Sequence, residues 1–131
     1  MANAAVLASI RTWLLASAGV AALVGARIHV SRADVSGVVP ALALELGGGS
    51  GALNPGIDQV EIRVNAWSSV SWSEALAALD AAADALRNKT FRDGLPAPAL
   101  SVIRVGAPSQ ISDQTYFHAQ LSVTVLARGG A

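Results

Sequence analysis

The chain of 131 residues contains no cysteine. This absence excludes disulfides, thiolate metal sites and cysteine nucleophiles, and it is compatible with a reducing cytoplasm. Charge is also scarce, because charged residues make up 14% of the chain where about 25% is typical of soluble domains. So little charge would hardly cover the surface of a monomer. It indicates either buried subunit interfaces or simply an alanine-rich composition.

A concentration of positive charge is missing as well. The nine basic and nine acidic residues cancel, and no stretch gathers lysine and arginine. Tight binding of nucleic acid depends on such a stretch, so we do not expect it here. The uncharged run 12–26 is too short to span a membrane. The mostly apolar stretch 13–24 could pass for the core of a signal peptide, but the apolar residues before it follow helical spacing, so a secreted binding module is only an alternative.

Residues 57–67 show the alternation of a half-buried strand. Every second residue is apolar: Val60, Ile62, Val64 and Ala66. The residues between them are polar: Gln59, Glu61, Arg63 and Asn65. A shift of register by one residue would turn the whole apolar set to water, so the pattern fixes which face is packed.

An amphipathic helix follows this strand almost directly. Ser71-Trp72-Ser73-Glu74 predicts a capping box, in which Ser71 accepts from the amide of Glu74 and Glu74 accepts from the amide of Ser71. Apolar residues then recur at helical spacing: Trp72, Leu76, Leu79, Ala83 and Leu86. We expect this stripe, with Trp72 at its start, to pack in the core.

The remaining pattern predicts a single α+β domain over residues 1–131. A first helix is expected from Asn3 to a stop at Gly19, with a further turn at 20–24. Strands are expected at 27–30, 38–46, 100–105 and 115–127, with a hairpin connection at 107–114. Adjoining strands and few helices favour a mostly antiparallel sheet of four to five strands, with two main helices packed on one face. The other face should stay open to water or a partner.

Glycines crowd the connection before the 57–67 strand, at 47–49, 51 and 56. They do not form a phosphate-binding loop, because no Lys-Ser/Thr follows and the chain enters a strand instead of a helix. A mobile hairpin loop is the expected structure. Loops of this length are often functional, so we expect it to contact a partner.

The sequence offers little for catalysis. His29 and His118 fall on separate predicted strands. Either could act as a general base, with Asp58, Asp113 or Glu61 as the acidic partner, in a small α+β enzyme such as a hotdog-like thioesterase. No His-x-x-x-His spacing occurs, and the serines at 68–73 lack a nucleophile-elbow frame. We therefore assign no catalytic, metal-binding or cofactor-binding residue, and the enzyme is the alternative function.

Trp67 lies on the polar phase of its strand. It is either the anchor of a protein interface or a strand-end side chain folded over the edge of the domain. The candidate contact surface combines this polar phase with the glycine loop. Its residues are Glu61, Arg63, Asn65, Trp67, Gly48, Gly49 and Ser50.

Several separated stretches together resemble one family. An N-terminal helix comes first and leads to Leu23-Val24-Gly25-Ala26-Arg27-Ile28 and then to Val39-Pro40-Ala41-Leu42. Next come the strand 60–67, a Ser-rich turn and an Ala/Leu helix, and the last stretch is the closing strand 117–125. In this order and spacing they are similar to the small tail-completion, or tail-terminator, proteins of long-tailed bacteriophages and gene transfer agents. Ala41 departs from the family, which has an aromatic residue after the proline.

The resemblance implies a structural protein with no active site and no cofactor. Such proteins form a six-membered ring on the last ring of the tail tube, stop tube growth and present the surface that docks on the head connector. The implied partners are further copies of the chain, the tail tube protein and a head completion or connector protein. DNA would pass through the hole without specific binding, and no membrane is involved. The implied location is the head-tail junction of the virion, after synthesis in the bacterial cytoplasm.

Overall fold

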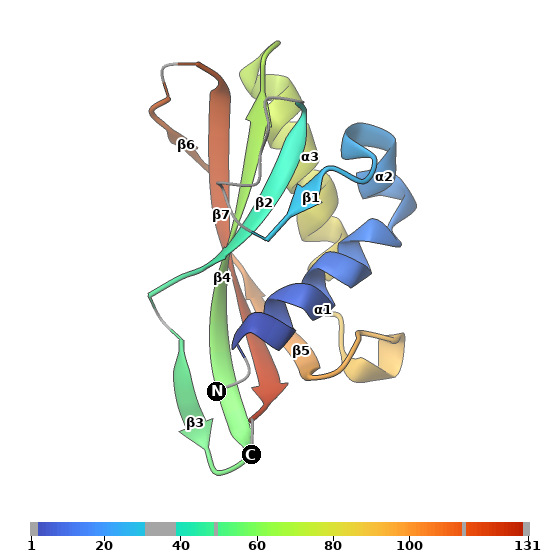
Figure 1. Cartoon of the computed structure of the whole chain (residues 1–131), viewed down its shortest axis with the longest axis vertical. Coiled ribbons are helices and arrows are strands. Elements are labelled where there is room, and N and C mark those ends of the chain that lie inside the picture. The colour runs from blue at the N-terminus through green and yellow to red at the C-terminus, as the bar shows by residue number, and fades with distance from the viewer. Residues whose placement is uncertain (1–2, 31–38, 49, 114, 130–131) are drawn as a thin grey trace.

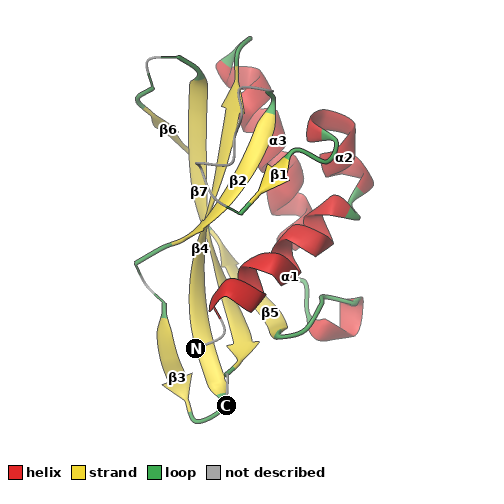
Figure 2. Cartoon of the chain, in the orientation of Figure 1, coloured by secondary structure: helices red, strands yellow, loops and turns green. Residues whose placement is uncertain are grey.

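The computed structural model describes residues 3–30, 39–48, 50–113 and 115–129. Its helices are α1 (Asn3–Leu15), α2 (Ala18–Val24), α3 (Trp72–Leu86) and the short 3-10 helix η2 (Phe91–Asp93). Its strands are β1 (Ile28–His29), β2 (Ala41–Leu46), β3 (Gly51–Asn54), β4 (Ile57–Ser68), β5 (Ala99–Val105), β6 (Ser109–Ile111) and β7 (Phe117–Arg128). Helices α1, α2 and α3 all lie on the same side of one sheet (Figure 1, Figure 2).

The two longest strands, β4 and β7, form the centre of the sheet. They are antiparallel and paired over their whole length, from Ile57 opposite Arg128 to Ser68 opposite Phe117. We call the Ser68 end the upper end, as in Figure 1. At this end β2 pairs with β4 and β6 pairs with β7, and at the lower end β3 pairs with β4 and β5 pairs with β7. The central pair therefore has different flanking strands at its two ends.

The α+β class and the helices on one face are confirmed, but the predicted strand number was too low. The sheet has seven strands and is mixed, because β1 runs parallel to β2. Two short strands lie in segments that we expected to be loops: β3 in the glycine-rich connection and β6 in the connection 107–114. These strands exist because their backbones pair with a long neighbouring strand. With only four and three residues, they are too short to show the alternation of apolar and polar residues by which a strand is predicted from sequence. Similarly, the expected turn at 20–24 is a third helix, α2.

The core lies between the helices and the inner face of the sheet. On β4 the predicted alternation is confirmed, since Val60, Ile62, Val64 and Ala66 are fully buried. Fully buried residues of the helices meet them: Val6, Ile10, Leu14, Val20, Val24, Leu79 and Leu86. Burial of this apolar surface supplies most of the stabilisation.

The packed face of α3 differs from the predicted stripe. Ala75, Ala78 and Ala82 are buried, whereas Leu76 and Trp72 are only half-buried. Small alanine side chains let α2 and the sheet approach the helix closely, so the helix turns these residues inward. The ring of Trp72 instead packs edge-on against Phe117, with 5.5 Å between ring centroids. The expectation that Trp72 begins a core stripe is therefore wrong.

The start of α3 confirms half of the predicted capping box. The Ser71 hydroxyl accepts from the Glu74 amide at 3.2 Å. The other half is relayed through Ser68, whose hydroxyl donates to the Glu74 carboxylate at 2.8 Å and accepts from the Ser71 amide at 3.2 Å. Hydrogen bonds of Ser68 and Ser71 thus tie the end of strand β4 to the start of helix α3.

Within the described residues, no single helix is long and apolar enough to cross a membrane. Only taken together do residues 4–15 and 18–24 have the length and apolar composition of a membrane span, and the two helices are bent by 88° at the break between them. Their fully buried side chains, among them Ile10 and Val20, are part of the core.

Candidate partner-contact surface

The face of the sheet opposite the helices, here called the outer face, carries polar side chains from β2, β4, β5 and β7. Strand registers place them in rows, with Trp67 opposite His118, Asn65 opposite Gln120, and Glu61 opposite Thr124. Their burial divides the face into two parts. At the upper end lies a buried polar cluster: Asn65, Trp67, His118 and Gln120. Below it lies an open polar patch: Glu61, Arg63, Arg104, Ser122 and Thr124.

Asn65 is the centre of the buried polar cluster. Its side-chain oxygen lies 2.9 Å from His118 Nε2 and accepts from Gln120 Nε2 at 2.9 Å. Because an amide oxygen can only accept, His118 Nε2 must carry a proton in this arrangement. Asn65 Nδ2 donates to Oε1 of Glu45, which lies on the neighbouring strand β2, at 3.2 Å. One amide side chain therefore links three strands.

Trp67 closes the cluster from above. Its ring stacks on His118 with 4.5 Å between centroids and 20° between planes. Asp113 lies in the loop beside this pair and accepts from the amides of Thr115 and Tyr116 at 2.8 and 2.9 Å. These amides, first Tyr116 and then Thr115, hold the pKa of Asp113 below its ordinary value, with smaller contributions from His118 and Trp67. The loop before β7 is thus tied to the cluster.

The prediction of an open outer face is wrong at the upper end. Asn65 is 0% exposed, Trp67 6% and His118 2%. A tryptophan buried within its own chain is no exposed interface anchor, and His118 does not face solvent as its strand phase suggested. Glu61 and Arg63 are only half-buried, so a partner protein can still reach their side chains from the solvent.

The open polar patch contains a shallow depression of about 240 Å³, lined by Glu61, Arg104, Gly106, Ser122 and Thr124. The acid and the base lie on either side of the Ser122 and Thr124 hydroxyls, because Thr124 of β7 pairs with both Glu61 and Arg104. Charges of both signs beside hydroxyl groups suit polar contacts with another protein surface.

The glycine-rich segment lies against this patch. The Gly47 amide donates to the Glu61 carbonyl at 2.8 Å, and the Glu61 amide donates to the Ser50 hydroxyl at 3.0 Å. The Glu61 side chain covers Gly47, where an added Cβ would overlap it. Of the predicted loop residues, Gly48 is exposed, Ser50 is half-buried and Gly49 lies outside the described residues. Ser50 and Glu61 are therefore brought together, as the predicted surface required.

The structure brings Asp113 near His118, where the Asp113 carboxylate accepts from two backbone amides, but it does not bring the other residues of the enzyme alternative to this place. Asp58 lies on β4 nine positions before Trp67, the residue opposite His118, which is about 30 Å along a strand. Asp58 also lies in the phase of β4 that faces the helices, whereas His118 lies on the outer face. His29 is on β1, two strands away from β4. In the ranges that the structure describes, no group of three or more His, Cys, Asp and Glu residues could hold a metal ion.

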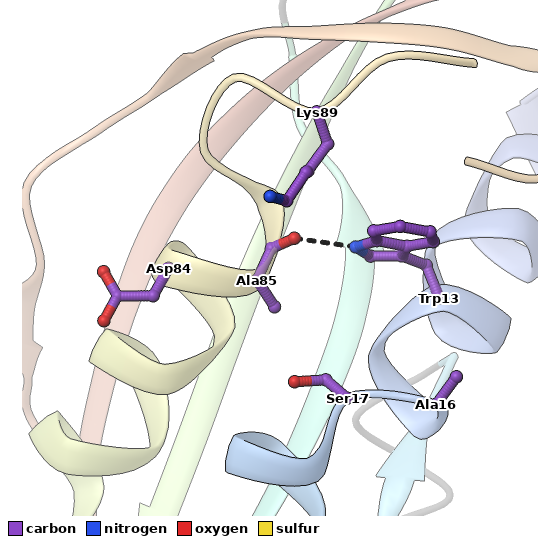
Figure 3. A pocket seen from close by; sticks show the side chains of 6 residues that line it. All are labelled: Trp13, Ala16, Ser17, Asp84, Ala85 and Lys89. Carbon is purple, nitrogen blue, oxygen red and sulfur yellow. Dashed lines mark hydrogen bonds between the residues drawn. The ribbon is translucent and has the colours of Figure 1, made fainter. Parts of the chain in front are cut away.

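A pocket of about 290 Å³ opens on the helix side, between the α1–α2 junction and the end of α3 (Figure 3). Its residues are Trp13, Ala16, Ser17, Asp84, Ala85 and Lys89. The Trp13 indole donates to the Ala85 carbonyl at 2.7 Å, one of the last carbonyls of α3 that the helix itself leaves without a partner. Trp13 therefore anchors α1 to α3, which is a structural task.

The sequence gives one signal for the buried polar cluster that our prediction did not use. Asparagine is disfavoured in strand interiors, yet Asn65 stands within one of the two longest strands. Such a residue needs hydrogen-bond partners when it is buried. Two of the partners, His118 and Gln120, come from β7, more than 50 residues away, so the cluster becomes visible only once the β4–β7 register is known.

A family model and a solved structure relate this chain to proteins of phages and phage-like particles. The family model described as "Tail completion protein gp17" matches residues 8–128. A chain in the solved structure "Virion of native gene transfer agent (GTA) particle" has a similar fold, with a TM-score of 0.63 and 17% identity over 94% of each chain. No curated protein sequence matches the chain significantly.

Proposed function

Because this chain belongs to the family of tail completion proteins, we propose that it forms a ring that caps the tail tube of a long-tailed phage or phage-like particle. The ring ends polymerisation of the tube and provides the joint to the head connector. The carrying observation is the family match over residues 8–128, which includes every described helix and strand except the first residues of α1. In this proposal the whole chain, 1–131, acts as one tail-terminator-like domain without an active site.

The helix layer supports a role within an assembly. The exposed residues of α1 and α2 are uncharged: Ala4, Ala5, Ala8, Thr12, Ala18, Gly19, Ala21, Ala22 and Leu23. Arg11, the one charged residue of these two helices, is half-buried and donates to the Ile28 carbonyl at 2.6 Å. A surface of small apolar residues costs little to desolvate, so it suits contact with another protein.

The open polar patch is the proposed contact surface on the other side of the sheet. Glu61 and Arg63 offer one charge of each sign, the Ser50 hydroxyl is hydrogen-bonded to the Glu61 amide, and the exposed Gly48 lies two residues before Ser50 in the chain. We assign this surface to a partner in the particle, either another copy of the chain, the tail tube protein or a head completion protein. Asn65 and Trp67 support it from within, because they fix the register of the strands that present it.

A channel through the ring would let DNA pass without holding it. Nine basic residues balance nine acidic ones, so the chain as a whole has no net attraction for phosphates. We therefore propose transit of DNA without specific binding, and a location in the virion at the head-tail junction.

A deletion experiment tests the proposal. Cells that produce the particles but lack this protein should accumulate heads and tails that are not joined, and the purified protein should restore joining when it is added to the lysate. Electron micrographs count joined particles directly. Normal numbers of joined particles without the protein would contradict the proposal.

A further inference from the structure

Residues 44–46 of β2 and 103–105 of β5 form two strand edges that have no strand beside them in the described part of the chain. β1 pairs with β2 only at Leu42 and Ala43, so β2 is the edge from residue 44 to residue 46. On the opposite side of the sheet, residues 89 and 90 cover the edge of β5 that faces away from β7, but only up to Val102. There the Val102 amide donates to the Lys89 carbonyl at 2.8 Å. From residue 103 to residue 105 this edge is open too. Open edges present unpaired backbone groups that can bind another strand.

The two edges lie at the same level of the sheet. Leu46 pairs with Ile62, Ile62 with Val123, and Val123 with Val105. Neighbouring strands across β2, β4, β7 and β5 are all antiparallel, so β2 and β5 run in opposite directions. Copies placed side by side in the same orientation would therefore bring β5 of one against β2 of the next as an antiparallel pair. A rotation about an axis along the strands generates this arrangement.

The side chains on the two edges complement each other. Leu46 is 40% exposed and Ile103 53%, so both edges carry a large apolar side chain that is open to contact. Next to Leu46 stands an acid, Glu45, and next to Ile103 stands a base, Arg104, both in the phase of the outer face. Arg104 is exposed, and Glu45 is half-buried and accepts from Asn65 Nδ2 within its own chain, so Arg104 would be an additional partner for its carboxylate. An acid and a base in opposite positions of an antiparallel pair stabilise it.

We propose that β5 of one copy pairs with β2 of the next, so that the sheet continues from subunit to subunit around the ring. In the register that sets Arg104 opposite Glu45, Ile103 meets Leu46 and Val105 meets Leu44. The partner is thus a second copy of this chain, and the two surfaces are different, as a closed ring requires. This inference rests on the proposed ring and assigns the strands that join its subunits.

Cysteine cross-linking tests this junction, because the chain has no cysteine of its own. In the L46C/I103C variant the two positions lie three strand spacings apart, about 14 Å, which is too far for a disulfide within one chain. Mild oxidation should give a ladder of linked chains that ends at the number of subunits in the ring. The control L46C/V70C places its second cysteine at Val70, which is 70% exposed and lies outside both edges, and it should stay monomeric in denaturing gels.

Electron micrographs of the same samples, alone and on tail tubes, separate the two claims. Rings without a ladder would overturn the strand junction and leave the proposed function intact. Linked dimers from L46C alone would mean that like edges meet, which also overturns it. Absence of rings from the wild-type protein in both samples would overturn the proposed function together with the junction. Independently, Arg104→Glu should raise the concentration needed for assembly about tenfold, and Arg104→Lys should leave it nearly unchanged.

Discussion

The upper and lower parts of the outer face use the same strands and the same alternation for different purposes. Above, Asn65, Trp67 and His118 are buried and bound to one another. Below, Glu61, Arg63 and Arg104 keep access to the surrounding solvent. The difference shows that a polar phase in a strand does not by itself identify a surface for partners.

Physically, the two parts differ in what their polar groups contribute. A hydrogen bond in a buried site cannot be replaced by water, so the loss of one partner leaves the other unsatisfied. Charges at the surface are screened and contribute little to stability. The buried polar cluster should therefore govern folding, and the open polar patch should govern association.

Replacement of Trp67 tests the upper part most severely. Trp67→Ala removes a buried ring and its stacking on His118, so the free energy of unfolding should fall by about 3 to 5 kcal/mol. Urea denaturation followed by circular dichroism measures the change. Val70→Ala is the control, since Val70 is 70% exposed and its loss should matter little. A loss below about 1 kcal/mol for Trp67→Ala would mean that the buried polar cluster does not govern folding.

Asn65→Ala should have the next largest effect. It leaves the buried His118 and the half-buried Gln120 without their common acceptor, which should cost about 1 to 3 kcal/mol. Gln59→Ala is the matched control, because Gln59 lies in the same phase of the same strand and is only half-buried. Equal losses for the two variants in urea denaturation would contradict a special role for Asn65.

Arg63→Ala should separate association from folding. The unfolding free energy should stay within about 0.5 kcal/mol of the wild type. Binding to tail tubes or to further copies should weaken, because Arg63 belongs to the open polar patch. Co-sedimentation with tubes and the mass of the purified oligomer measure this. Unchanged association would remove Arg63 from the proposed surface.

The smallest effect is expected at Asp113. Its lowered pKa means that the carboxylate stabilises the fold at neutral pH, and that this contribution is lost as the pH falls below about 4. Asp113→Asn should lower the melting temperature slightly at pH 7, and the difference from the wild type should shrink at pH 3. A difference of the same size at both pH values would show that the charge of Asp113 is not involved.

The sequence predicted local structure well where side chains alternate over many residues. The packed phase of β4, the Ser71 cap and the helix side of the sheet follow from such patterns. β3 and β6 could not be predicted, because their pairing with β4 and β7 and not their own residues defines them. The surface prediction failed at Asn65 and Trp67 for a similar reason. Their burial depends on side chains from distant strands, which strand phase alone does not reveal.

The length of tail tubes is the most direct measure of the central claim. Tube protein should be polymerised with and without this chain, and the tube lengths counted in electron micrographs. If the chain caps the tube, its addition should stop growth and shorten the tubes as its concentration rises, with density for the chain at one end only. The same distribution of lengths with and without the chain would contradict the account.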